Sequence, residues 1–212
     1  MINRRATEAR RKRYDRIAPV YDLMELMNER RMHPWREKLW AQVPPVRVLE
    51  VGVGTGKNFE YHPRDARMTG IDFSPRMLER ARHRAAELRD PIELRQMDAQ
   101  AIEFPDASFD AVAATCVFCS VPDPVQGFRE VKRVVKPGGR IFLMEHMRHP
   151  NLILGAVMDA LTPLVRWMGP DINRRTLDNI RAAGLETEHV EDLGMGGIFK
   201  LIVARVPNGK MP

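Results

Sequence analysis

The stretch VLEVGVGTG at residues 48–56 decides the fold of this chain. A run of aliphatic residues that contains the acidic residue Glu50 leads into three glycines that alternate with other residues, Gly52, Gly54 and Gly56. Glycine lacks a Cβ atom and tolerates positive φ angles, so such a loop lets a ligand lie close to the backbone. If a helix follows, its free N-terminal amides attract anionic groups. The stretch therefore predicts a strand, a ligand-binding turn and the start of a helix.

Downstream of this stretch, short β-branched runs alternate with charged amphipathic segments, which is typical of a parallel sheet covered by helices. The expected strands are residues 46–51, 67–71, 92–96, 111–115 and 140–145, followed by an antiparallel pair at 185–193 and 198–206. The expected helices are residues 75–88, started by Ser74 and Pro75, and residues 124–135, stopped by a turn at KPGG, residues 136–139. We therefore predict an α/β fold: a Rossmann-like, seven-stranded, mostly parallel sheet with helices on both faces, an antiparallel last strand and an N-terminal helical cap.

Length and charge define the expected organisation. A chain of 212 residues suits a single α/β domain, which we place at residues 41–212 with an apolar insertion at 150–170. Residues 1–40 are expected to form basic amphipathic helices, because they hold 11 Lys and Arg against 6 Asp and Glu and so supply +5 of the net charge of +6. Two cysteines and no apolar leader after Met1 favour the cytoplasm over a secreted disulfide scaffold.

The glycine loop and the end of the next strand indicate a nucleoside ligand. A dinucleotide fingerprint counted from Gly52 requires glycine at the position of Lys57, which weakens an NAD interpretation. Asp72 follows the second strand, 22 residues after Glu50, where an acidic side chain accepts hydrogen bonds from two ribose hydroxyls. The alternatives are a glycine-rich turn without a ligand and an Asp72 that only caps the next helix.

The spacing ExGxGxG resembles motif I of class I S-adenosylmethionine-dependent methyltransferases. The resemblance implies S-adenosyl-L-methionine as cofactor, S-adenosyl-L-homocysteine as product, and a glycine loop behind the methionine moiety. It places Asp98 at the adenine amine, with a backbone contact from Ala99, although an exposed loop carboxylate is the alternative for Asp98. The implied cofactor site consists of Glu50, Gly52, Gly54, Gly56, Asn58, Asp72, Phe73, Met77, Asp98, Ala99, Thr115 and Cys116.

Cys116 and Cys119 form a CxxC pair, which suggests a metal half-site or a redox pair. A tetrahedral zinc site needs two further ligands at suitable spacing, and the sequence has no second cysteine pair. We therefore expect buried packing for both cysteines and no metal.

A second motif, RYDRIAPVYD at residues 13–22, bears on the substrate. It resembles the segment ahead of the core in ubiquinone/menaquinone C-methyltransferases and in Rhodobacter-type bacterial phosphatidylethanolamine N-methyltransferases. The resemblance extends through REVKRVVKPGG at 129–139 to Glu145 and His146, a pair that is also similar to membrane-associated thiol methyltransferases. It implies that segment 13–22 folds over the cofactor and closes the substrate pocket; alternatively, Tyr14 and Tyr21 only anchor a helix.

Charge and apolar patterning favour a phospholipid. Residues 4–16 carry seven basic and two acidic side chains and precede an apolar stripe of Leu23, Met24, Leu26 and Met27. Such a terminus is suited to an anionic membrane surface. Residues 151–168 carry only Asp159 and Arg166 as charged side chains, with Trp167 among the apolar ones. We expect two short interfacial helices there, divided at Pro163. A solvated basic helix, a buried helix pair and a dimer interface are the alternatives.

These features together predict a phospholipid N-methyltransferase that converts phosphatidylethanolamine successively toward phosphatidylcholine. We expect Glu145 or His146 to take the proton of the ammonium group, and Tyr14 and Tyr21 to hold the cationic head group. The enzyme is expected on the inner face of the cytoplasmic membrane as a peripheral protein, without a nucleic-acid partner, because the basic arm lacks interleaved aromatic residues. A C- or S-methyltransferase of a quinone precursor or lipophilic thiol, and a non-catalytic lipid-binding module, remain open.

Overall fold

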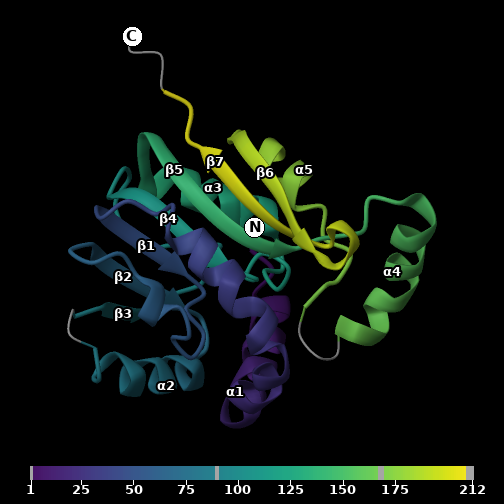
Figure 1. The fold of residues 1–212 in the computed structure, drawn as a ribbon, viewed down its shortest axis with the longest axis horizontal. Helices are drawn as coiled ribbons and strands as arrows, with labels where there is room; N and C mark the ends of the chain where they lie inside the picture. Colours follow the sequence, from purple (N-terminus) through teal and green to yellow (C-terminus); the bar gives the residue numbers. More distant parts are fainter. Residues whose placement is uncertain (1, 89–90, 167–169, 209–212) are drawn as a thin grey trace.

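The structure is a computed structural model that describes residues 2–88, 91–166 and 170–208, apart from the side chains of residues 24–28. Its described part forms a seven-stranded sheet in the order β3-β2-β1-β4-β5-β7-β6 (Figure 1). The strands are β1 Arg47–Val51, β2 Arg67–Asp72, β3 Glu93–Gln96, β4 Phe109–Thr115, β5 Val135–His146, β6 Glu186–Gly194 and β7 Phe199–Arg205. Of the seven described strands, β7 alone runs opposite to the others, so it pairs antiparallel with both β5 and β6. The predicted α/β sheet and its antiparallel last strand are confirmed.

The order of the strands determines where a ligand can bind. The chain first moves outward from β1 to β2 and β3 and then returns to place β4 on the other side of β1. At such a reversal, the connections after neighbouring strands diverge and leave a crevice beyond the carboxyl ends of the strands. The glycine loop follows β1, Asp72 ends β2 and Thr115 ends β4. The topology therefore gathers the predicted site residues at one edge of the sheet.

Helices α2 and α3 begin with the caps that the sequence predicts. Ser74 Oγ accepts a hydrogen bond from the Met77 amide at the start of α2, Pro75–Ala85, which ends three residues earlier than expected. Helix α3, Pro124–Val134, ends as predicted ahead of residues 136–139. Those four residues are part of β5 instead of a free turn, because the register with β4 jumps from Phe109↔Val135 to Ala111↔Arg140 and accommodates them as a bulge.

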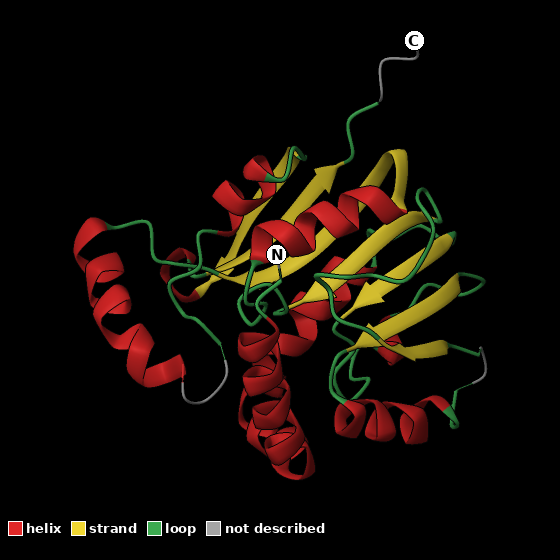
Figure 2. Ribbon diagram, turned by 180° about the vertical axis from the view of Figure 1, so that it is seen from behind, coloured by secondary structure: helices red, strands yellow, loops and turns green. Residues whose placement is uncertain are grey.

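The sheet carries helices on both faces, as the opposite views in Figures 1 and 2 show. On one face, α3 and the short helix α5, Thr176–Ala182, bury Phe128, Val131 and Ile180 against the strands. On the other face, the carboxyl end of α1 buries Leu39 and Trp40. The amphipathic pattern of the sequence does not predict α5, which spans only seven residues.

Three expectations about helices were wrong. The helix expected after the glycine loop is a single 3-10 turn, Phe59–Tyr61. The amino-terminal region forms one helix, α1, Arg4–Trp40, which continues through Pro19 and Pro34. A proline removes one helical hydrogen bond, and contacts between α1 and the rest of the protein keep the helix continuous. Helix α4, Leu152–Val165, is likewise a single helix, because Pro163 lies in its last turn. Trp167 and Met168 lie outside the described residues, as do the side chains of Met24, Leu26 and Met27.

Candidate functional site

A cavity lies at the carboxyl ends of β1, β2 and β4, and we call it the strand-end cavity. Most of the predicted site residues line it. They are Tyr14, Tyr21, Gly52, Gly54, Asp72, Phe73, Met77, Asp98, Ala99, Thr115 and Cys116. The structure therefore brings together eleven residues that the sequence proposed from five separate segments.

Asp72 connects the glycine loop to the start of α2. Its Oδ2 accepts a hydrogen bond of 2.9 Å from the Gly54 amide, and its Oδ1 accepts one of 2.9 Å from the Ser74 amide. The side chain is buried, and burial raises the pKa of Asp72 to about 6. At neutral pH the carboxylate is mostly ionised and can accept hydrogen bonds from a ligand's hydroxyls. Asp72 thus makes the helix-start contact named as its alternative role and also faces the cavity.

The backbone at Gly54 offers space for a ligand. Gly54 has φ +55°, and a Cβ atom built on it meets no atom within 4 Å. At Gly52 the same atom would lie 2.5 Å from Cγ2 of Val117, so this glycine is required by packing. At Gly56 it would lie 2.4 Å from the ring of Phe59. Of the three glycines, Gly54 is therefore the one that forms a cradle for a group lying against the backbone.

Asp98 is held in the strand-end cavity by Gln100, a residue that sequence reasoning missed. The Gln100 side-chain amide donates hydrogen bonds of 3.0 Å to both carboxylate oxygens of Asp98, and the Gln100 backbone amide adds another of 2.9 Å. The same side chain also lies 3.0 Å from Thr7 Oγ1 on α1. A glutamine in a loop gives no sequence signal for this arrangement.

Glu50 lies outside the lining of the strand-end cavity and acts through Asn58. Its carboxylate is fully buried, accepts a 2.6 Å hydrogen bond from Asn58 Nδ2 and lies 2.9 Å from His62 Nε2. Asn58 Oδ1 in turn accepts a 2.9 Å hydrogen bond from Arg36 of α1. Glu50 is therefore a positioning residue in the structure, and His62 and Arg36 are partners that its motif does not reveal.

A second cavity, of about 490 Å³, adjoins the first and lies beside α1. We call it the helix-side cavity. The two cavities share Tyr14, Tyr21, Thr115, Cys116 and Ser120 in their linings. Asn58 and His146 line the helix-side cavity only. A molecule in the second cavity would lie next to one in the first, which is the arrangement that a group-transfer reaction requires.

The adjacent residues Glu145 and His146 are directed to different places. Glu145 Oε1 accepts hydrogen bonds of 2.9 Å from the Val117 amide and 3.0 Å from the Phe118 amide. The side chain is fully buried, and burial raises its pKa to about 7. Neither cavity has Glu145 in its lining. Glu145 therefore holds the loop after β4, whose residue Val117 lines the strand-end cavity.

His146 faces the helix-side cavity and packs edge-on against Phe199, with ring centroids 5.2 Å apart. Burial lowers the pKa of His146 below its ordinary value of 6.5. Its Nδ1 is a buried atom without a hydrogen-bond partner among the described residues. The imidazole is therefore neutral at physiological pH and able to accept a proton. Of the two predicted candidates for the base, His146 is the one that reaches a cavity.

The segment containing Tyr14 and Tyr21 lies over the glycine loop. Tyr14 Oη and Ser120 Oγ are 2.5 Å apart, and burial raises the pKa of Tyr14. Asp15 accepts a 2.6 Å hydrogen bond from Ser74, and Asp22 accepts one of 2.6 Å from Thr55 in the glycine loop. Tyr14 thus anchors α1, and both tyrosines line the two cavities.

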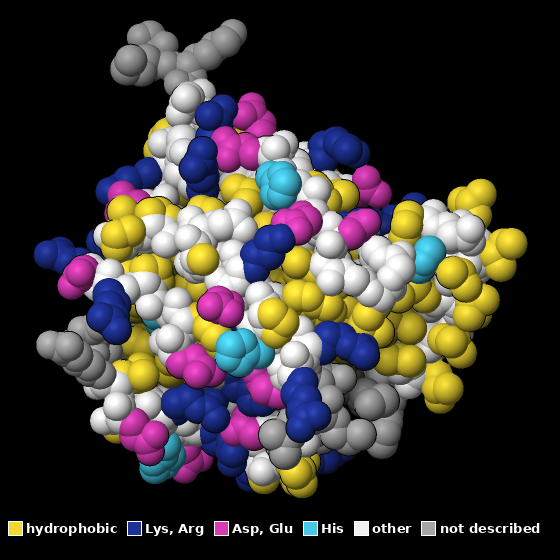
Figure 3. Space-filling view, viewed as in Figure 1, with side chains coloured by type: hydrophobic (Ala, Val, Ile, Leu, Met, Phe, Trp, Pro, Cys, Tyr) yellow, Lys and Arg dark blue, Asp and Glu magenta, His cyan; other side chains and the backbone are white. Residues whose placement is uncertain are grey.

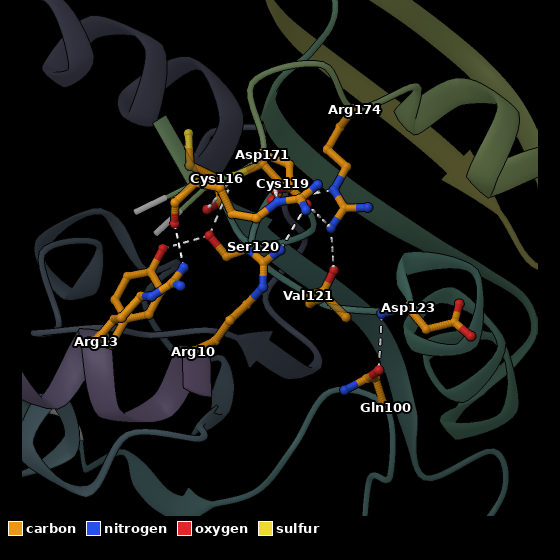
Figure 4. Close-up of polar contacts among 12 residues, drawn as sticks. Arg10, Arg13, Gln100, Cys116, Cys119, Ser120, Val121, Asp123, Asp171 and Arg174 are labelled. Atoms are coloured by element: carbon orange, nitrogen blue, oxygen red, sulfur yellow. Dashed lines mark hydrogen bonds and ion pairs between the residues drawn. The ribbon is translucent and has the colours of Figure 1, made fainter. Parts of the chain in front are cut away.

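Neither cysteine forms a disulfide bond. Cys116 lines both cavities with φ +56°, whereas Cys119 is buried and donates a 3.3 Å hydrogen bond to the Cys116 carbonyl (Figure 4). Burial raises the pKa of Cys119 to about 12. Cys119 is therefore an unreactive thiol at neutral pH.

Comparisons with known proteins agree with this geometry. Residues 49–143 match a family model described as a methyltransferase domain. A phosphatidylethanolamine N-methyltransferase from Cereibacter sphaeroides is 38% identical over 162 residues, which cover 74% of this chain and 78% of that protein. A demethylmenaquinone methyltransferase from Tropheryma whipplei (strain Twist) is 32% identical and covers 91% of this chain and 80% of that protein. A thiol S-methyltransferase from Homo sapiens is 33% identical over 58% of this chain and 54% of that protein.

Solved structures share the fold. An S-adenosylmethionine-dependent methyltransferase from Thermotoga maritima superimposes with a TM-score of 0.71 at 22% identity, over 93% of this chain and 99% of that one. The cyclase SpnF gives a TM-score of 0.68 at 23% identity, over 84% of this chain and 81% of that one. At this level of sequence identity, the similarity shows a shared fold, and the reaction has to be argued from the site residues.

A methyl group at Gly54 should block the cofactor. We expect Gly54→Ala to weaken S-adenosylhomocysteine binding at least about tenfold, because its Cβ would occupy the open space against which the ligand lies. Isothermal titration calorimetry measures the affinity. Gly184→Ala is the matched control, since Gly184 has a similar φ of +74° and lies outside both cavities. Equal affinities for the Gly54 variant and the parent would rule out close approach at this residue.

Replacing Glu145 should change how stability depends on pH. With its pKa raised from 4.5 to about 7, Glu145 holds a proton in the folded state that the unfolded chain has lost, so its contribution to stability falls as pH rises through that window. We expect Glu145→Gln to gain roughly 2–3 kcal/mol relative to the parent between pH 4.5 and 7. Urea unfolding at several pH values measures the free energy of unfolding of both proteins. The contribution of Asp72 is the same in the two and cancels in their difference. Parallel plots of unfolding free energy against pH would contradict a raised pKa for Glu145.

Proposed function

Because the chain belongs to the S-adenosylmethionine-dependent methyltransferases, we propose that it methylates the amino group of phosphatidylethanolamine, in successive steps toward phosphatidylcholine. The observation that carries the proposal is the position of His146, an uncharged imidazole in a cavity that adjoins the Gly54 cradle. An amine acceptor needs such a group, because a protonated nitrogen has no lone pair with which to react. The sequence relative that acts on phosphatidylethanolamine supports the choice of amine.

The strand-end cavity holds the cofactor in this proposal. Gly54 supplies the cradle, Asp72 accepts hydrogen bonds from the ribose hydroxyls and Asp98 accepts one from the adenine amine. When bound, S-adenosylmethionine supplies an electrophilic methyl group whose sulfur leaves as a neutral thioether, so no acid is needed to assist departure. The protein's main task is therefore to align the acceptor and exclude water.

The residues around the helix-side cavity prepare the acceptor. His146 accepts a proton from the ammonium group through its imidazole and leaves the amine nitrogen with a free electron pair. Tyr14 and Tyr21 lie where the two cavities meet and orient the head group. Arg31 and Lys57 also line the helix-side cavity, and their charge suits the lipid phosphate. The basic residues of α1 face an anionic leaflet in this proposal, with the enzyme held peripherally at the inner face of the cytoplasmic membrane.

A second candidate is methylation of a quinone precursor at carbon. The described residues that line the helix-side cavity include Arg31, Arg36 and Lys57 but no carboxylate. Glu29, outside the lining, lies 2.8 Å from Lys57 and 3.9 Å from Arg36 and offsets part of this charge, and the remaining positive charge favours an anionic acceptor such as a phenolate over a cation. The demethylmenaquinone methyltransferase relative also covers more of the chain than the phosphatidylethanolamine enzyme does.

No helix in the described part of the chain has the length and apolar character needed to cross a bilayer. The membrane contact proposed above is a surface association through the basic residues of α1.

The direct test offers three acceptors to the enzyme. Purified protein is incubated with labelled S-adenosylmethionine and, separately, phosphatidylethanolamine vesicles, a demethylated quinol and a lipophilic thiol, and the products are resolved by mass spectrometry. We expect mono-, di- and trimethylated lipid. Methylation of the quinol or the thiol with the lipid left unchanged would overturn the substrate assignment.

His146→Gln tests the base. We expect kcat for the lipid amine to fall by about 10²–10⁴, which is the usual contribution of general base catalysis, while S-adenosylhomocysteine affinity stays unchanged. In the parent, kcat should rise with pH as His146 loses its proton, with a midpoint below 6.5, and the variant should lack this step. A variant that keeps both the rate and the pH profile would remove His146 from the mechanism.

A further inference from the structure

The face of α4 that points away from the protein is apolar. Its exposed residues are Leu152, Ile153, Leu154, Val157, Leu161 and Leu164, with 46% to 81% of each side chain accessible. The helical spacing places Ile153, Val157 and Leu164 along one side, whereas Gly155 and Thr162 are buried on the opposite side. Figure 3 shows these hydrophobic side chains gathered at the edge of the molecule, where α4 stands apart from the sheet in Figure 1. An apolar face of this extent marks an interaction surface.

The one charged side chain of α4, Asp159, is 42% exposed and is paired with residues of neighbouring loops. Asp159 accepts hydrogen bonds from Arg148, the shorter being 2.9 Å, and one of 3.0 Å from Asn173. Asp159 therefore lies away from the apolar face, which is left free of charge. A helix on the surface of a soluble protein usually turns a polar side to water, whereas α4 exposes apolar residues along the side of Ile153, Val157 and Leu164.

An excess of positive charge lies at the carboxyl end of α4. The Asp171 carboxylate, which is buried, lies 2.8 Å from Arg10, 2.7 Å from Arg166 and 2.6 Å from Arg174 (Figure 4). We call these three side chains the arginine cluster. These three guanidinium groups share this one carboxylate. Burial, together with the positive charges of Arg10 and Arg166, lowers the pKa of Arg174.

The arginine cluster lies between α4 and the helix-side cavity. Arg166 caps the carboxyl end of α4 and its side chain is 52% exposed. Val165, which precedes Arg166, lines the helix-side cavity, and so do Pro170 and Ile172, which lie on either side of Asp171 in the sequence. An apolar helix face next to exposed positive charge is the combination that binds the surface of an anionic bilayer.

We propose that α4 inserts its apolar face into an anionic lipid leaflet and that Arg166 binds lipid phosphate beside the helix-side cavity. This inference rests on the proposed function and adds the element that enters the bilayer. Helix α1 contributes charge at longer range, because Arg10 is buried against Asp171 and Arg11 is hydrogen-bonded to Glu8. In this arrangement, a lipid head group reaches the cavity while its acyl chains stay in the membrane.

Vesicle binding tests the inference. The probe is vesicles made of equal parts of phosphatidylcholine and phosphatidylglycerol, and partitioning is measured by sedimentation. We expect Ile153→Asp combined with Leu164→Asp to weaken binding at least about tenfold, because two charges would enter the apolar face. Leu23→Asp on α1 is the matched control, since Leu23 is 69% exposed, and it should change binding by less than about twofold. S-adenosylhomocysteine affinity should be the same in all three proteins, which verifies folding.

The contribution of charge is measured separately. Arg166→Gln leaves Asp171 with Arg10 and Arg174 as partners, so the fold should tolerate it. We expect this variant to bind the anionic vesicles more weakly than the parent and to bind pure phosphatidylcholine vesicles equally well. Equal binding by parent and variant to anionic vesicles would remove Arg166 from the proposal.

Several outcomes would overturn the role of α4. The first is that the parent protein does not bind the vesicles, and the second is that the double variant binds them as well as the parent does. The third is that the parent is a dimer and the double variant a monomer, while both bind the vesicles equally. The last outcome would make the face an interface between two copies. Vesicle binding through α4 without methylation of phosphatidylethanolamine would contradict the proposed function and leave the docking inference intact. If parent and double variant methylate detergent-dispersed lipid equally and the double variant loses activity only on vesicles, both the proposed function and the role of α4 are supported.

Discussion

The contact between the Asp72 carboxylate and the Gly54 amide is the constraint on which the site depends. It joins the end of β2 to the loop after β1, and the second oxygen of the same carboxylate joins the loop to the start of α2. Burying a carboxylate costs free energy unless its oxygens are hydrogen-bonded. The amides of the glycine loop and of the start of α2 supply those hydrogen bonds to Asp72, the carboxylate that a ligand would also contact. Because the contact fixes the path of the glycine loop, it also fixes the open space at Gly54.

The sequence predicts the part of the site that is local to the strand ends. Strands that are buried on both faces appear in the sequence as continuous aliphatic runs, and parallel strands end at one edge, so the glycine loop and Asp72 could be expected at one site. The resemblance to a known family added Asp98, which lines the same cavity as Gly54 and Asp72. Residues that act through another residue could not be found in this way. Ser120 and Gln100 contact Tyr14 and Thr7 of α1, which are 106 and 93 positions away. His62 meets Glu50, which is 12 positions away. Their types are common in loops and follow no periodicity.

Helix continuity was harder to predict than helix presence. Pro163 suggested a break, and residues 1–40 were expected to form more than one helix, but α4 continues through Pro163 and α1 continues through Pro19 and Pro34. Proline costs a helix one hydrogen bond and some steric strain, and tertiary contacts can offset that cost. In α1, Asp15 and Asp22 bind Ser74 and Thr55 on either side of Pro19. Helix α5 was missed for the opposite reason, since its seven residues are too few to establish an amphipathic period.

The separate positions of Glu145 and His146 follow from strand geometry. Consecutive side chains of a β-strand point to opposite faces of the sheet, so two neighbouring residues at the end of β5 cannot serve the same cavity from the same side. Glu145 therefore meets the amides after β4, and His146 meets Phe199 and the helix-side cavity. Sequence reasoning named either residue as the base, since both lie at the end of the strand. His146 shares its face of β5 with Phe142 and Met144, which pack in one cluster with Leu39 and Trp40 of α1. The residue that reaches the helix-side cavity is therefore the one on the face of the sheet that α1 covers.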